Sequence, residues 1–157
     1  MSKVLKYMNE ETLRLGDVSA GIEHLFLGII REGNGSAMRV LINLGIVPKD
    51  IRKIIESAIR RVKEMTNVTN ENLTLRKQTE RVLKKSILER KNLEEEEIKT
   101  IHVLLAILLD KNNIVTAALR HMQVTYDIVL DEYLSLNTDI AATLEDPTEE
   151  NNDDDIF

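Results

Sequence analysis

Apolar residues recur along this chain at the three- and four-residue spacing that places them on one face of a helix. In the first segment, MSKVLKYMNEETLRLG, they form one stripe that stops at Gly16, a residue suited to the left-handed exit from a helix. The next apolar segment, from about Ile22 to Arg31, contains the run HLFLGII and is apolar on nearly every side. We therefore expect this second helix to be buried in the centre of the fold.

The same pattern predicts four helices in each half of the chain. Asn34 or Ser36 can cap the third helix, Gly45 ends it, and Pro48 is a favoured first-turn residue for the fourth. The expected helices are residues 2–15, 22–31, 34 or 36 to 44, and 48–62 in the first half, and 75–90, 100–110, 113–121 and 125–136 in the second.

The two halves repeat each other. When the sequence is shifted by 78 residues, the halves align without a gap, and residues 24–27 (HLFL) fall on residues 102–105 (HVLL). Apolar positions fall on apolar positions elsewhere, so both halves should bury the same helix faces. An internal duplication explains this better than chance, and the predicted fold class is all-α, with two pseudo-symmetric four-helix repeats.

The composition divides the chain into four parts. We expect a first repeat at residues 1–64, a linker at 65–74, a second repeat at 75–136 and an acidic tail at 137–157. The linker segment is rich in Asn and Thr and poor in apolar residues. The tail carries eight carboxylates and neither Lys nor Arg, so we expect a solvated linker or a truncated end.

Composition and charge also exclude several classes of protein. The 157 residues include no cysteine, which excludes disulfides, thiolate metal sites and a cysteine nucleophile. The net charge of −6 comes from the tail, because the rest of the chain carries 19 acidic and 21 basic residues. The nearly neutral charge of residues 1–136 argues against nucleic-acid binding. The chain contains no run of about 18 apolar residues, so we expect no membrane span. We expect a cytoplasmic protein that binds neither nucleic acid nor a membrane.

The sequence also lacks recognisable catalytic motifs. No glycine is followed by lysine, which excludes a Walker A phosphate loop. The three histidines, His24, His102 and His121, have no metal-ligand spacing. His24 and His102 occupy equivalent positions at the start of the buried helix, where we interpret them as structural, hydrogen-bonded residues. We therefore expect no catalytic residue, no metal and no cofactor in this chain.

Three segments of the first half resemble a known repeat family. Residues 15–16 (LG), 21–35 (GIEHLFLGIIREGNG) and 40–45 (VLINLG) resemble the Clp N-terminal repeat, whose pattern is LGH, IGTEHLLLGLLREGEG and VLxxLG. Residues 100–108 (TIHVLLAIL) resemble it more loosely. The resemblance covers about residues 1–136 and is to the N-terminal domain of ATP-dependent Clp ATPases, of the ClpC type. Such a double Clp-N motif consists of two pseudo-symmetric four-helix repeats, which agrees with the periodicity.

The resemblance implies recognition and not catalysis. In full-length relatives this domain captures adaptor proteins and marked substrates, and passes them to an ATP-driven unfolding ring and its peptidase. ATP would then be bound by downstream modules of the longer protein. A stand-alone Clp-repeat adaptor or regulator without a motor remains an alternative. A helical hydrolase or ligand-binding protein that borrows the fold is the third alternative.

The resemblance also suggests one binding residue. ClpC-type domains bind phosphoarginine, a degradation mark, and the glutamate of the GTEH motif pairs with its guanidinium. Glu23 matches that glutamate in the first repeat, whereas the equivalent residue in the second repeat is Ile101. The preceding threonine is replaced by Ile22 in the first repeat and kept as Thr100 in the second. Glu23 is equally explained as a first-turn carboxylate that favours the helix dipole.

Overall fold

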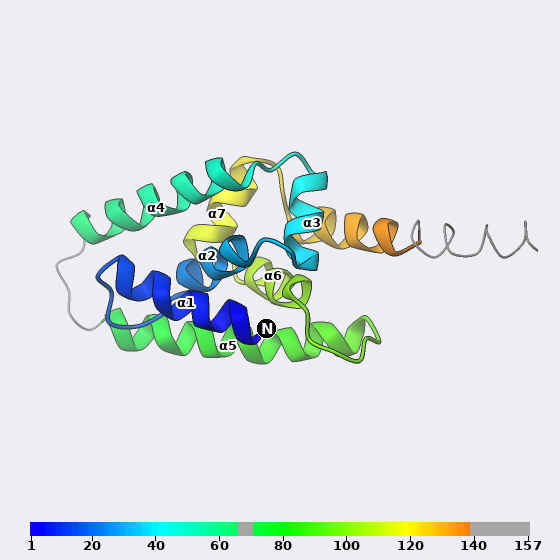
Figure 1. The fold of residues 1–157 in the computed structure, drawn as a ribbon, viewed down its shortest axis with the longest axis horizontal. Coiled ribbons are helices and arrows are strands. Elements are labelled where there is room, and N and C mark those ends of the chain that lie inside the picture. The colour runs from blue at the N-terminus through cyan, green and yellow to red at the C-terminus, as the bar shows by residue number, and fades with distance from the viewer. Residues whose placement is uncertain (66–70, 139–157) are drawn as a thin grey trace, which may run out of the picture.

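The computed structural model describes residues 1–65 and 71–138. Within these residues the chain is helical and contains no strand, which confirms the all-α prediction (Figure 1). The helices are α1 (Ser2–Arg14), α2 (Ile22–Glu32), α3 (Ser36–Asn43), α4 (Pro48–Met65), α5 (Glu71–Asn92), α6 (Thr100–Leu109) and α7 (Ile114–His121). Residues 126–138 are also helical, and we call them helix 126–138.

Most helix ends lie within one or two residues of the predicted ends, but two helices extend into the segment expected to be a linker. Helix α4 continues to Met65, and α5 begins at Glu71 instead of Leu75. The Asn and Thr residues of this segment have low helix propensity, so the sequence pattern did not extend the two helices into it. Residues 66–70 and most of the expected acidic tail, 139–157, lie outside the described residues.

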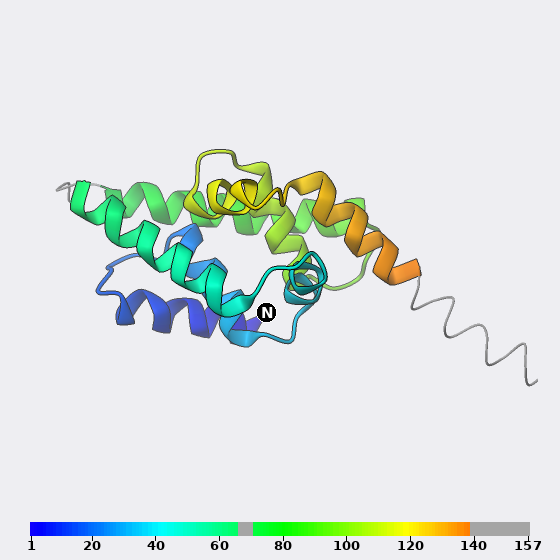
Figure 2. The ribbon, with the colours of Figure 1, turned by 90° about the horizontal axis from the view of Figure 1, so that it is seen from above.

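Helices α2 and α6 form the centre of the molecule. Residues 22–30 of α2 and 100–108 of α6 are all buried, as expected for their nearly continuous apolar sequences. In Figure 1 the two helices lie between α4 above and α5 below. Figure 2 shows α4 and helix 126–138 extending in opposite directions from this centre. The arrangement gives the two repeats their approximate two-fold relation.

The two repeats share one core. Helix α2 packs against α1 and α6 against α5, and α3 packs across the repeats on α6, as α7 does on α2. The buried apolar side chains form a single cluster that includes residues from both halves. Gly28 permits the close approach of α1 to α2, because a Cβ atom at Gly28 would lie 2.7 Å from the backbone oxygen of Val4.

No single described helix is long and apolar enough to cross a membrane. Helices α6 and α7 reach that length and apolarity only as a pair, and they meet at a bend of 90°.

Candidate functional site

A histidine closes the first turn of α2. The Nδ1 atom of His24 accepts a hydrogen bond of 2.8 Å from the backbone N–H of Gly21. Its Nε2 atom lies 2.6 Å from Oδ2 of Asp17, so this geometry assigns the ring proton to Nε2 as the donor. Lys63 on α4 pairs with the other oxygen of Asp17 at 2.7 Å. The buried imidazole thus fixes the loop before α2, which confirms the structural role predicted for His24.

The second repeat builds the same feature at the start of α6. The backbone N–H of Lys99 donates a hydrogen bond of 2.8 Å to Nδ1 of His102. The Nε2 atom of His102 lies 3.5 Å from Glu95 and has no hydrogen-bond partner among the described residues. Burial is the main cause that lowers the pKa of His102, although Glu95 acts in the opposite direction. His102 is therefore also a structural residue, but only one of its two ring nitrogens has a hydrogen-bond partner among the described residues.

The 78-residue repeat also relates the carboxylates of these two histidine–carboxylate pairs, although the motif search did not identify them. Asp17 and Glu95 are themselves related by the 78-residue shift, and each precedes its histidine by seven residues. The acidic loop at residues 94–97 therefore contains one carboxylate with a duplicated structural role. Tyr133 of helix 126–138 donates a hydrogen bond of 2.6 Å to Glu95, which ties that helix to the same loop.

Glu23 lies in the first turn of α2, one residue before His24. Its side chain is buried, with a residue exposure of 7%, and folds back over Gly21. A Cβ atom at Gly21 would lie 2.5 Å from Oε1 of Glu23, so glycine is required at that position for this arrangement. No arginine or lysine of the described residues forms an ion pair with Glu23, and its Oε1 atom lies 3.8 Å from Nδ1 of His24.

The amides at the start of α2 have no side-chain cap. The N-cap residue is Gly21, which offers no oxygen, and no described side chain accepts a hydrogen bond from the N–H groups of Ile22 or Glu23. Free amides at a helix N-terminus favour an anion. The start of α2 thus places a carboxylate without a cationic partner beside donors without an acceptor.

The start of α6 differs in both respects. The position equivalent to Glu23 holds Ile101, which is fully buried. The hydroxyl oxygen of Ser36 accepts a hydrogen bond of 3.1 Å from the N–H of Ile101. In return, the hydroxyl of Thr100 accepts one of 3.0 Å from the N–H of Ala37 at the start of α3. The helices α3 and α6 therefore cap each other, and the second repeat lacks both groups present at α2.

A polar cavity of about 530 Å³ lies over the starts of α3 and α6. Charged side chains of both signs line it, and they are Lys3, Glu32, Arg39, Glu97 and Lys99. Glu23 does not line this cavity. Within the described part of the chain, no group of three or more His, Cys, Asp or Glu residues is arranged to hold a metal ion.

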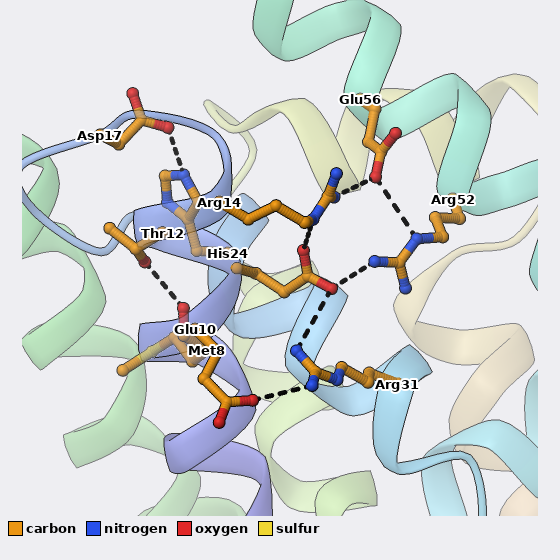
Figure 3. Close-up of polar contacts among 10 residues, drawn as sticks. Met8, Glu10, Thr12, Arg14, Asp17, His24, Arg31, Arg52 and Glu56 are labelled. Atoms are coloured by element: carbon orange, nitrogen blue, oxygen red, sulfur yellow. Dashed lines mark hydrogen bonds and ion pairs between the residues drawn. The ribbon is translucent and has the colours of Figure 1, made fainter.

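An arginine–glutamate cluster joins three helices of the first repeat, and the sequence pattern did not predict it. Glu11 of α1 is 1% exposed and binds Arg14 Nε at 2.6 Å and also Arg52 of α4. Arg31 of α2 lies 4.0 Å from Glu11. Figure 3 shows Arg14, Arg31 and Arg52 converging from three helices on one carboxylate. Glu10 and Glu56 complete the cluster by pairing with Arg31 at 2.8 Å and Arg52 at 3.3 Å.

The cluster is electrically balanced, with three arginines and three glutamates. Burial raises the pKa of Glu11, but hydrogen bonds and charge from Arg14 and Arg52 outweigh it, so the pKa lies below its ordinary value. Every charge has a partner within the chain. This arrangement serves to hold α1, α2 and α4 together.

Comparisons with known proteins match most of the chain. A sequence profile described as the Clp repeat (R) N-terminal domain matches residues 1–122. The chain is 32% identical over 134 residues to the "Negative regulator of genetic competence ClpC/MecB" of Bacillus subtilis, covering 85% of this chain and 16% of that protein. It is 30% identical over 139 residues to a ClpA homolog of Guillardia theta, described as an ATP-dependent Clp protease ATP-binding subunit, covering 88% and 17%. It is 32% identical over 120 residues to the chloroplastic chaperone ClpC1 of Arabidopsis thaliana, covering 76% and 13%.

Proposed function

Because this chain belongs to the Clp repeat N-terminal domain family, we propose that it is the substrate- and adaptor-recognition domain of a Clp unfoldase in the cytoplasm. It would deliver captured proteins to an ATP-driven unfolding ring and its peptidase. The profile match over residues 1–122 carries this proposal, and the names of the relatives support it. The chain spans about a sixth of the length of those relatives, and ATP binding would belong to the remaining modules.

Phosphoarginine is the substrate mark that we propose for this domain, with Glu23 as its guanidinium ligand. A carboxylate can form a paired, charge-assisted hydrogen bond with a guanidinium. Glu23 has no cationic partner of its own among the described residues, and the uncapped amides at the start of α2 suit a phosphate. Both halves of the ligand would then bind within one helical turn.

The second repeat supports only one such site in the chain. Ile101 cannot pair with a guanidinium, and Ser36 already accepts the hydrogen bond of its amide. A ligand at α6 would have to displace that cap. We therefore expect a stoichiometry of one phosphoarginine for each chain, at α2.

Titration of the protein with a phosphoarginine peptide tests this proposal. Glu23→Gln should weaken binding about ten- to a hundredfold, because one charge-assisted hydrogen bond contributes about 1.5–3 kcal/mol. Ile101→Val preserves the core and should leave the affinity unchanged. The unphosphorylated arginine peptide should bind more weakly than the phosphorylated one. Equal affinity of the wild type and Glu23→Gln would remove Glu23 from the site.

A second experiment separates the recognition domain from the stand-alone adaptor. The purified chain should not hydrolyse ATP, and its coding sequence should continue past Phe157 into ATP-binding modules. A stop codon at that point would favour the adaptor, and ATP hydrolysis by the purified chain would contradict both.

A further inference from the structure

The second repeat contains a buried carboxylate that corresponds to the centre of the arginine–glutamate cluster. Glu89 is related to Glu11 by the 78-residue shift and is equally buried, at 4% exposure. Its Oε2 atom accepts a hydrogen bond of 2.8 Å from the hydroxyl of Tyr126. Among the described residues, no arginine, lysine or histidine forms an ion pair with Glu89. The carboxylate position is thus duplicated, but its cations are not.

The residues that surround Glu89 explain why it has no cation. The shift places Asn92 at the position of Arg14, Leu109 at that of Arg31 and Leu130 at that of Arg52. The two outer glutamates of the cluster are also replaced, Glu10 by Leu88 and Glu56 by Leu134. Four of the five charged neighbours of the buried carboxylate have therefore become leucines.

These four leucines, Leu88, Leu109, Leu130 and Leu134, form what we call the leucine surface. Three of them are well exposed, Leu88 by 57% and Leu109 and Leu134 by 45% each. Leu130 is partly buried and packs against the core. Exposed leucines at adjoining positions differ from single apolar residues scattered over a surface, because they offer a continuous apolar area to a partner.

In the first repeat the equivalent positions lie on one face, and we infer the same for the four leucines. Glu10 contacts Arg31, Arg52 contacts Glu56, and both arginines approach Glu11. In the second repeat, α5 packs against α6, and the hydrogen bond from Tyr126 to Glu89 holds helix 126–138 against α5. Leu130 and Leu134 follow Tyr126 at four-residue intervals, so they lie on the same stripe of that helix.

We propose that the leucine surface docks a protein segment that presents apolar side chains around one arginine, whose guanidinium pairs with Glu89. In the first repeat the equivalent carboxylate, Glu11, is paired with arginines alone. The group that Glu89 lacks is therefore a guanidinium. A buried carboxylate is stabilised when a charged partner and hydrogen bonds replace its water. A guanidinium suits this role better than an ammonium, because its planar donors can bind both carboxylate oxygens. The identity of the partner as a protein segment rests on the proposed recognition function.

Tyr126 would remain in place when the partner binds. Burial, together with the hydrogen bond to Glu89 and its charge, raises the pKa of Tyr126 to about 12. The phenol therefore stays protonated and keeps donating to Oε2 at neutral pH. The incoming guanidinium would find a carboxylate that is already oriented.

Selection from a phage-displayed library of helical peptides, on the immobilised full chain, tests the proposal. The enriched peptides should carry one arginine among apolar residues. In fluorescence anisotropy, replacing that arginine by citrulline should weaken binding about tenfold or more, which corresponds to ~1.4 kcal/mol. Glu89→Gln should abolish the difference between the arginine and citrulline peptides. Enriched peptides without arginine, or an unchanged difference in Glu89→Gln, would overturn the proposal.

A transplant of the first-repeat residues gives a folded control. The variant Leu88→Glu, Asn92→Arg, Leu109→Arg, Leu130→Arg, Leu134→Glu gives the second repeat all six residues of the cluster, so it should keep its helix content by circular dichroism and lose peptide binding. Leu88→Asn alone should also weaken binding, whereas Leu13→Asn, on a more exposed leucine of α1, should not. Equal loss in Leu13→Asn would contradict a specific surface, and a wild-type dimer that the transplant dissociates would assign the surface to a second copy.

The same variants distinguish this inference from the proposed phosphoarginine site. The transplant leaves the start of α2 unchanged, so its affinity for the phosphoarginine peptide should equal that of the wild type. Glu23→Gln should in turn leave binding of the selected peptides unchanged. A negative result for the leucine surface therefore does not contradict the phosphoarginine site, and the reverse also holds.

Discussion

The two buried histidines hold equivalent backbone turns but differ in how completely their rings are paired. His24 contacts a carboxylate through a hydrogen bond of 2.6 Å, whereas the closest approach of His102 Nε2 to Glu95 is 3.5 Å. Both rings accept the N–H of the N-cap residue through Nδ1, a contact that only the ring form unprotonated at Nδ1 can make. Protonation at Nδ1 would remove that contact in either repeat.

The stability of the fold should fall as the pH decreases below neutrality, with His102 as one cause. Burial lowers the pKa of His102 in the folded chain, although Glu95 raises it and Lys99 and Arg90 lower it further. The unfolded chain therefore binds a proton more readily, since its histidine titrates near 6.5. The contribution of His102 is complete above that value and decreases as the pH falls from about 6.5 toward the lower folded pKa.

Urea unfolding at pH 7.5 and pH 5.5 measures this effect. The free energy of unfolding of the wild type should decrease between the two values, and His102→Gln should show a smaller decrease because its side chain does not titrate. An identical decrease in both proteins would mean that other groups cause it. The carboxylates Glu11 and Glu95 titrate at lower pH, since their folded pKa values lie below the ordinary range.

The packing of whole helices depends on the buried glutamates differently in the two repeats. Glu11 joins α1 to α4 through Arg52, and Arg14 also reaches across to Glu56. Glu89 joins α5 to helix 126–138 through a single tyrosine hydroxyl. The two carboxylates share a position and a degree of burial, so they form a matched pair for measuring what the arginines contribute.

Glu11→Gln should destabilise the fold more than Glu89→Gln. Removal of the Glu11 charge leaves the exposed Arg14 and the half-buried Arg52 with Glu56 as their remaining carboxylate, which should cost about 1–3 kcal/mol. Glu89→Gln keeps an acceptor for Tyr126 and removes a buried charge that has no ion-pair partner among the described residues, so the expected loss is below about 1 kcal/mol. Urea unfolding at neutral pH compares them, and equal losses would contradict the assigned role of the arginines.

The helices themselves were predictable from the sequence because apolar periodicity is a local property. The shift of 78 residues also identified the equivalence of the repeats and of His24 with His102. The start of α5 was misplaced because Asn and Thr residues obscured a helix that is supported from its C-terminal part, where Val82, Ser86 and Glu89 are buried. The burial of charged residues such as Glu11 could not be read from periodicity, because their partners lie on other helices.

The candidate site was less predictable than the fold. Sequence comparison placed Glu23 at the start of a buried helix, and the structure adds that its carboxylate folds over Gly21. Whether the amides of that turn are capped depends on residues from the other repeat. At α6 the cap is Ser36, and its equivalent near α2 is Ile114, which has no hydroxyl. The difference between the two helix starts thus arises from packing across the repeats.

The chain as a whole joins its halves through both apolar packing and exchanged hydrogen bonds. Thr100 of the second half caps the start of α3 in the first, and Ser36 of the first half caps α6 in the second. Thr79 donates a hydrogen bond of 2.8 Å to the backbone oxygen of Ala20. Each half therefore depends on the other for groups that would otherwise be buried without partners.

We expect that neither half of the chain folds alone. Residues 1–65 and 71–138, produced separately, should each have low helicity and lack a cooperative thermal transition, because α2 and α6 would expose apolar faces that they bury against each other's repeat. Mixing the two halves should restore helicity, measured by circular dichroism, with a transition that moves to higher temperature as concentration increases. Cooperative unfolding of either half alone would show that one repeat is sufficient, and the exchanged caps would then contribute little to stability.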